Sequence, residues 1–388
     1  MVDPPESGRP GERIAFVPSP ERTLGIEMEV SLVDPESGRL LPRAREILEA
    51  LDGDANVKPE LFQSIVEVNT GVCHTVAEAR SDLAARLARV REIAREKGCE
   101  LICTGTHPMT AWADVPISPD ARYLGLVDRM QWPARRLLIC GIHVHVGLPS
   151  GEHAIALTNA LSCFIPHFLA LSASSPFWGG RDTGLASCRS KIFEGLPTAG
   201  LPPRLTNWAE FVTLMRTLLS AETITSIREV WWDIRPHPNF GTIELRMCDG
   251  MNTLCEVAAV AAFAQCMVEY LVNQYDMGEP LPEMKRWTLA ENRWRAARFA
   301  LDADLIRNER GDQIPLREHI REWVDHLMPT AEALGCAREL SEVLSILEHG
   351  PSYARQRAWF QAHGDVAKVV SELVAELKHD APWKQPRG

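Results

Sequence analysis

Apolar and polar residues alternate in Leu24-Gly25-Ile26-Glu27-Met28-Glu29-Val30-Ser31-Leu32. A period of two predicts a β-strand with one face in an apolar core. The other face carries Glu27 and Glu29, which lie about 7 Å apart at a rise of ~3.3 Å per residue. Glutamate is uncommon in strands, so this pair indicates either a solvated face opposite lysines or a functional site.

Three further segments alternate in the same way and carry polar residues suited to ligand binding. In chain order, their polar faces present Glu67, then His143 and His145, then Glu244 and Arg246. Two imidazoles on one strand face can bind a metal ion, but they can also be partly exposed structural histidines. Glu60 lies on the opposite face from Glu67 in a regular strand. It can join the site only if a bulge intervenes or the chain is not yet extended there.

If these polar faces line one cavity, several carboxylates converge in it. Two carboxylates ~4 Å apart repel by about 4 kcal/mol at an effective dielectric constant near 20, so the cluster needs bound cations. Oxygen ligands with one or two imidazoles favour Mg²⁺ or Mn²⁺ over structural zinc. Two or three such ions beside arginines would suit a polyphosphate. The candidate arginines are Arg235, Arg246, Arg181 and Arg293.

No other phosphate-binding motif is evident in the sequence. It contains neither GxxxxGK[ST] nor GxGxxG after a predicted strand. Phosphate binding would therefore depend on the metal ions and the guanidinium groups.

The composition is that of a soluble globular protein, with 388 residues, 45% hydrophobic and 24% charged. A net charge of -11 and the lack of a long Lys/Arg run argue against a nucleic-acid partner. The longest apolar run, Val257 to Ala264, is too short to span a membrane, and no secretory signal is evident. Ten cysteines without a CxxC pair indicate buried, reduced thiols and a cytoplasmic location.

We predict a flexible tail over residues 1–20, one catalytic domain over 21–378 and a second tail over 379–388. Within the domain, residues 253–378 are expected to be mostly helical. A helix over 151–172 should be kinked at Pro166. Residues 174–206 are rich in Gly and Pro and are predicted to form an ordered binding loop, with Arg181, Arg189 and Lys191 available for anions. Capping boxes at Thr253 and Thr288 should each open a helix.

Six ordered motifs together resemble one known family. They are GIEME at 25–29, EVNTGVC at 67–73, GIHVHVG at 141–147, SPFW with GRDTG at 175–184, WWDIRPHP at 231–238 and ENRWR at 291–295. This set resembles the type 2 glutamate-cysteine ligase family of bacterial carboxylate-amine ligases, which includes the YbdK-like proteins and is related to glutamine synthetase. The resemblance extends from about residue 20 to 375. It implies an α+β fold, in which a curved, mainly antiparallel sheet forms a funnel with helices on its outer face.

The resemblance also implies roles for individual residues. Glu27, Glu29, Glu67, His143 and Glu244 would bind two or three Mg²⁺ or Mn²⁺ ions. His145 would lie nearer to nucleotide or substrate, Arg181 and Arg293 would bind the nucleotide, and Arg235 and Arg246 would act in catalysis. The implied cofactor is ATP, and the implied assembly is a homodimer.

The implied reaction is amide formation through an acyl phosphate. ATP phosphorylates a carboxylate, an amine attacks the acyl phosphate, and phosphate leaves. For this family the expected substrates are the γ-carboxyl of glutamate and the amine of cysteine. One alternative is a ligase of the same fold for another acid and amine pair in specialised metabolism. A second is a metal-dependent hydrolase or metal-binding module that does not use ATP.

Overall fold

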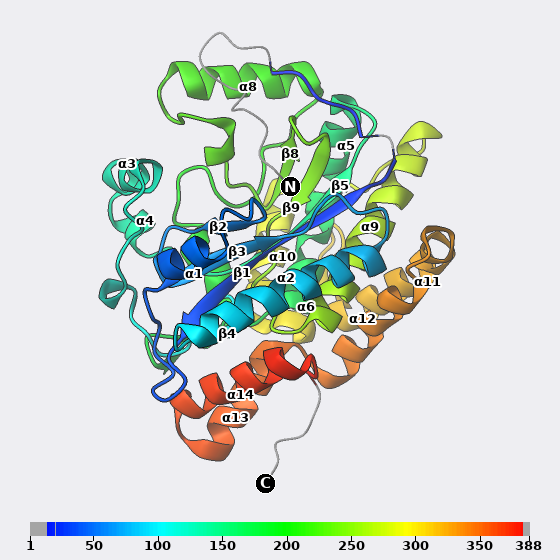
Figure 1. Ribbon diagram of the computed structural model, residues 1–388. Helices are drawn as coiled ribbons and strands as arrows, with labels where there is room; N and C mark the ends of the chain where they lie inside the picture. The colour runs from blue at the N-terminus through cyan, green and yellow to red at the C-terminus, as the bar shows by residue number, and fades with distance from the viewer. Residues whose placement is uncertain (1–13, 20, 383–388) are drawn as a thin grey trace.

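An open antiparallel sheet of seven strands forms the centre of the molecule (Figure 1). The computed structural model describes residues 14–19 and 21–382. The strand order is β2-β3-β1-β5-β9-β8, and β4 pairs with the last residues of β1. The bounds are Leu24–Val33 (β1), Val57–Pro59 (β2), Ile65–Asn69 (β3), Glu100–Ile102 (β4), Ile142–Gly147 (β5), Ile234–His237 (β8) and Thr242–Leu245 (β9). The predicted α+β class with a mainly antiparallel sheet is confirmed.

Helices cover one face of this sheet in two layers (Figure 1). The inner layer contains α2 (Val76–Glu96), α5 (Gly151–Leu161) and α9 (Leu254–Asp276), which contact the strands, and α6 (Ile165–Ser172), which packs on α9. Outside it, α11 (Leu316–Leu334) and α12 (Ala337–His349) pack on α9, and α10 (Arg286–Phe299) packs on α6. The helix α9 is apolar almost all round because it lies between the sheet and this outer layer.

The remaining elements surround this framework. The helices are α1 (Ala44–Ala50), α3 (Ala121–Met130), α4 (Trp132–Arg135), α7 (Cys188–Phe193), α8 (Trp208–Ser220), α13 (Ser352–His363) and α14 (Val366–His379). Two hairpins are formed by β6 (Phe177–Trp178) with β7 (Arg181–Asp182) and by β10 (Asp304–Ile306) with β11 (Gln313–Pro315). Short 3₁₀ helices occupy Trp112–Asp114, Ser162–Phe164, Ile227–Glu229 and Ala300–Asp302.

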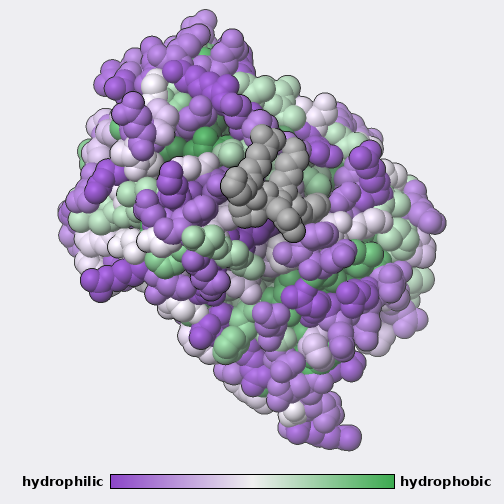
Figure 2. All heavy atoms as spheres, turned by 90° about the horizontal axis from the view of Figure 1, so that it is seen from below, coloured by the Kyte–Doolittle hydropathy of each residue, from purple (hydrophilic) through white to green (hydrophobic). Residues whose placement is uncertain are grey.

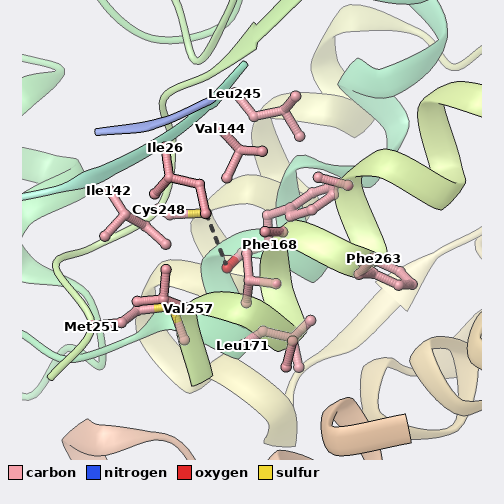
Figure 3. Close-up of a cluster of buried hydrophobic side chains, with 14 of the residues drawn as sticks. Ile26, Ile142, Val144, Phe168, Leu171, Leu245, Cys248, Met251, Val257 and Phe263 are labelled. Carbon is pink, nitrogen blue, oxygen red and sulfur yellow. Dashed lines mark hydrogen bonds between the residues drawn. The ribbon is translucent and has the colours of Figure 1, made fainter. Parts of the chain in front are cut away.

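The apolar residues of the alternating strands build the core between the sheet and the helices. Ile26, Val144 and Leu245 lie opposite one another in register, and each is only 1% exposed. Figure 3 shows them beside Phe168 of α6 and Phe263 of α9. Burial of each such side chain stabilises the fold by roughly 1.5–3 kcal/mol. This burial turns the apolar face of β1 toward the helices, so the polar face points away from them.

Some predicted helix boundaries are confirmed and one is wrong. The helix over 151–172 is interrupted by the 3₁₀ turn at 162–164, and Pro166 lies in the first turn of α6. Thr253 caps α9, and its side chain accepts a hydrogen bond from the Glu256 N–H. Thr288 caps nothing, because α10 begins at Arg286 and the Leu289 N–H already donates to the Lys285 carbonyl at 3.0 Å.

The predicted tails differ from the structure where it describes them. Residues 1–13 and 20 of the first tail lie outside the described residues, as do residues 383–388 of the second. Residues 14–19 pack on the domain, since Ile14 is buried and the Val17 N–H donates to the Pro238 carbonyl at 2.9 Å. Asp380, just past the end of α14, accepts hydrogen bonds from Arg80 and from the Cys255 N–H.

Two helical stretches, 151–172 and Leu254–Asp276, are long and apolar enough to cross a membrane. Their most apolar windows are 89% and 83% buried inside the protein, as is usual for core helices. All ten cysteines are unpaired and nine of them are buried, as predicted. Figure 2 shows that hydrophilic side chains predominate on the face seen from below.

Candidate active site

The predicted ligand residues share one face of the sheet because their strands pair in register. The opposed pairs are Gly25 with His145, His145 with Glu244, Glu27 with His143, and Glu29 with Glu67. Opposed residues of antiparallel strands project to the same side. This side is turned away from the helix layers and lines a cavity of about 350 Å³. The alternation of β1 therefore separates a core face from a cavity face.

Glu27, His145 and Glu244 form the first cluster, in which one ligand atom from each lies within 4.8 Å of the others. Glu244 lies between Arg235, whose Nη2 is 2.7 Å away, and Arg246. Burial raises the pKa of Glu244, but the charges of Arg235 and Arg246 outweigh it and hold that pKa well below its usual range. Glu244 is therefore ionised and shared by two guanidinium groups.

The two histidines of β5 contact Glu27 differently. His143 Nδ1 is 2.8 Å from Glu27 Oε2, a normal hydrogen-bond distance. His145 Nε2 is 3.4 Å from Glu27 Oε1 and 3.7 Å from Glu244 Oε1, and it is a buried atom without a hydrogen-bond partner among the described residues. Its other ring nitrogen is 3.0 Å from Thr242 Oγ1. A buried imidazole nitrogen between two carboxylates is arranged as a cation ligand would be.

Glu29, Glu60 and Glu67 form the second cluster, again with one oxygen from each within 4.8 Å of the others. Burial, followed by the charges of Glu27 and Glu60, holds the pKa of Glu67 well above its usual range. Burial and the charge of Glu29 raise the pKa of Glu60 to about 7. The charges of Arg122 and Lys58 offset this repulsion only in part, so without a cation the cluster tends to hold protons.

Glu60 joins the second cluster because it does not share a strand with Glu67. The strand β2 ends at Pro59, and β3 begins at Ile65 and runs antiparallel to β2. The chain therefore reverses direction between the two glutamates. The sequence had allowed Glu60 to join the site through a bulge or through a chain that is not yet extended, and the structure shows the second. The Leu61 N–H donates to Glu60 Oε2 at 3.0 Å and holds the carboxylate in this turn.

The four candidate arginines separate into two pairs. Arg235 and Arg246 line the cavity, and Arg246 Nε has no hydrogen-bond partner in the described part of the chain. Arg181 lies exposed in the β6–β7 hairpin and does not line the cavity. Arg293 is buried elsewhere, with its Nε 2.7 Å from Asp233 and its Nη1 3.1 Å from Glu194. The structure thus does not bring Arg181 or Arg293 to the carboxylate clusters.

The sequence prediction missed one wall of the cavity. Asp120, Arg122 and Tyr123 line it from the start of α3. The Tyr123 hydroxyl donates to the Pro59 carbonyl at 2.7 Å, which attaches this wall to β2. No motif marks these residues, because residues 109–133 show no regular period.

The fold of this chain is also found in solved structures of other proteins. Two solved structures share the fold: a glutamate--cysteine ligase from Francisella tularensis, in complex with AMP, and a bifunctional glutathione synthetase from Pasteurella multocida. The first has a TM-score of 0.68 and 13% identity over 96% of this chain and 91% of its own. The second has a TM-score of 0.65 and 12% identity over 93% of this chain and 53% of its own.

Sequence comparison identifies the family more narrowly. A profile described as Glutamate-cysteine ligase family 2 matches residues 23–372. A protein of Frankia alni named "Putative glutamate--cysteine ligase 2-1" is 52% identical over 95% of this chain and 99% of its own. A Thermobifida fusca protein named "Putative glutamate--cysteine ligase 2" is 50% identical over 95% of this chain and 94% of its own. The chain belongs to Glutamate-cysteine ligase family 2 and is an ATP-dependent, amide-forming ligase, as its motifs predicted.

Proposed function

We propose that the protein joins the γ-carboxyl of glutamate to the amine of cysteine, using ATP and two or more Mg²⁺ or Mn²⁺ ions. The observation that carries this proposal is the meeting of two carboxylate clusters and two arginines on one sheet face inside a cavity. A volume of about 350 Å³ is within the range of small-molecule sites. The substrates follow from the family name and from the relatives, two of which are named for this activity.

The residues present fit divalent cations. In the first cluster, two carboxylates and the unpartnered Nε2 of His145 supply hard oxygen ligands and one imidazole. In the second cluster, three carboxylates offer oxygen ligands alone. When bound, Mg²⁺ neutralises charge on the transferred phosphoryl group and on the leaving phosphate.

The geometry suggests two changes to the ligand set implied by the resemblance. His145 rather than His143 completes the first cluster, because its Nε2 has no hydrogen-bond partner among the described residues. His143 Nδ1 also lies 3.7 Å from Glu244 Oε1, but it already forms a hydrogen bond with Glu27. His143 forms a hydrogen bond from Nδ1 to Glu27 Oε2 and so orients that carboxylate. Glu60 is added to Glu29 and Glu67 in the second cluster.

The arginines of the cavity would bind the reacting phosphate. The carboxylate substrate attacks the γ-phosphorus of ATP, so that an acyl phosphate forms and ADP leaves. The cysteine amine then attacks the acyl carbon, the C–O bond to phosphate breaks, and an amide and inorganic phosphate remain. Arg235 and Arg246 are placed to stabilise the phosphoryl oxygens through both steps. Arg181 and Arg293 are left out of the proposed site because neither lines the cavity.

Purified protein with ATP and Mg²⁺ tests this function across a panel of acids and amines. We expect ADP release that rises when glutamate and cysteine are both present, together with a product of the mass of γ-glutamylcysteine. A larger response to another pair would replace the substrates but keep the ligase. A protein that binds no nucleotide and releases no ADP with any pair would contradict the proposal. A cytoplasmic location and a homodimer remain predictions, which fractionation and light scattering test.

A further inference from the structure

Arg189 of α7 is a buried arginine in the cavity wall, and it has no role in the reaction proposed above. It is 3% exposed and lines the cavity. Its Nη atoms donate to the main-chain carbonyls of Arg246 and Met247, both at the long distance of 3.4 Å. Its Nε has no hydrogen-bond partner, and in the described part of the chain no carboxylate lies within ion-pair distance of it. Its Cζ lies 5.5 Å from the centre of the Phe193 ring. The guanidinium therefore retains bonding capacity inside the cavity.

A buried cage holds the start of α7 and with it Arg189. Asp249 accepts hydrogen bonds from the Ser175 hydroxyl at 2.6 Å and the Ser187 hydroxyl at 2.8 Å. The Arg189 N–H donates to the same Ser175 Oγ at 3.0 Å. Gly105 allows the cage to close, because a Cβ there would lie 2.6 Å from Asp249 Cγ. The Asp249 carboxylate thus forms its hydrogen bonds with the cage and not with the guanidinium, although the nearby charge of Arg189 favours its ionised form.

The Arg189 guanidinium occupies space that only a glycine leaves open at position 141, directly before β5. A Cβ at Gly141 would lie 2.2 Å from Arg189 Nη2. The Gly141 N–H donates to Glu29 Oε2 at 2.6 Å, so this position is directly beside the second cluster. Arg189 therefore places a positive charge where the cavity approaches Glu29.

We propose that Arg189 binds an oxyanion of a substrate, either a carboxylate of the amino acid or a phosphate of the nucleotide, beside the second cluster. The proposal rests on the proposed function for the identity of those substrates. A guanidinium presents a planar pair of N–H groups that matches a carboxylate or phosphate, and a buried charge without such a partner is costly. Within the loop, Arg181 and Lys191 do not line the cavity, and Lys191 pairs with Glu194.

Three variants separate this role from a general effect of charge. Arg189→Met removes the guanidinium, and Gly141→Ala keeps it but displaces it through the new Cβ. Lys191→Met is the matched control, since it removes one positive charge from the same helix outside the cavity. We expect Arg189→Met to raise one KM in the ADP-release assay by about 10- to 100-fold. Gly141→Ala should raise the same KM by a smaller factor. Lys191→Met should leave the KM for glutamate and the KM for ATP within about twofold of the wild-type values.

The KM that rises identifies the oxyanion, glutamate for a carboxylate or ATP for a phosphate. A second readout does not need turnover: glutamate or inorganic phosphate, added separately, should raise the melting temperature of the wild-type protein but not of Arg189→Met. Arg189→Lys serves if the methionine variant does not fold, because a lysine keeps the charge but cannot bond through two parallel N–H groups.

The proposal is overturned if the folded Arg189 variants keep both KM values and the ligand-induced stabilisation, or if neither ligand stabilises the wild-type protein. A wild-type protein that releases no ADP but is stabilised through Arg189 would contradict only the proposed function.

Discussion

Glu244 and Glu67 line the same cavity, yet the residues around them shift their pKa values in opposite directions. Burial raises the pKa of both carboxyls. For Glu244 the charges of Arg235 and Arg246 outweigh burial and lower the pKa, whereas the neighbouring Glu27 and Glu60 raise that of Glu67 further. The first cluster thus carries its own positive charge, while the second must obtain more from bound cations or protons. Charge balance, more than depth, distinguishes the two halves of the site.

The largest effect is expected for Glu29→Gln in the second cluster. The substitution keeps the shape of the side chain but removes a negative ligand, so ADP release should fall by at least about a thousandfold. Circular dichroism should show an unchanged fold. Glu49→Gln, at an exposed surface ion pair with Arg45 on α1, is the control and should retain full activity. Unfolding of the Glu29 variant would instead indicate a structural role.

A large loss of stability is expected for Glu244→Gln in the first cluster. The change leaves Arg235 and Arg246 buried together without their shared carboxylate, which should cost about 3 kcal/mol of unfolding free energy. Urea denaturation with a chelator present measures this difference. A variant as stable as the wild-type protein would mean that water in the cavity already compensates the two arginines.

Glu67→Gln in the second cluster is expected to increase stability rather than decrease it. Removing one of the mutually repelling carboxylates should raise the unfolding free energy of the chelator-treated protein by about 1 kcal/mol. The stabilisation obtained by adding Mg²⁺ should shrink at the same time. Urea denaturation with and without Mg²⁺ tests both effects, and a loss of stability in chelator would contradict the contrast between the clusters.

The smallest effect is a pH dependence confined to metal-free protein. Burial and Glu29 raise the pKa of Glu60 from its ordinary 4.5 to about 7 in the folded protein. The folded state therefore binds this proton more tightly than the unfolded state, and the resulting stability is lost as the pH rises from 4.5 through about 7. In chelator, the melting temperature should fall across this window, and by less in Glu60→Gln. Saturating Mg²⁺ should reduce the fall, and equal slopes with and without Mg²⁺ would argue against this cation site.

Local patterns predicted a large part of this protein. The period of two placed Glu27 and Glu29 on the face opposite Ile26 and Met28, because alternation depends only on the backbone of one strand. The cap at Thr253 was predictable for a similar reason, since a capping box lies within one turn of helix. The motifs in order also predicted the family, and the family carries the fold.

The sequence by itself therefore determined the class of fold, the polar faces of the strands and the kind of reaction. Only the tertiary structure decided which groups meet. It brought Glu60 close to Glu67 through a chain reversal and placed His145 Nε2 between two carboxylates. It also placed Arg189, but not Arg181, in the wall of the cavity. These choices depend on strand register and loop path, which join residues far apart in the chain and leave no period in the sequence.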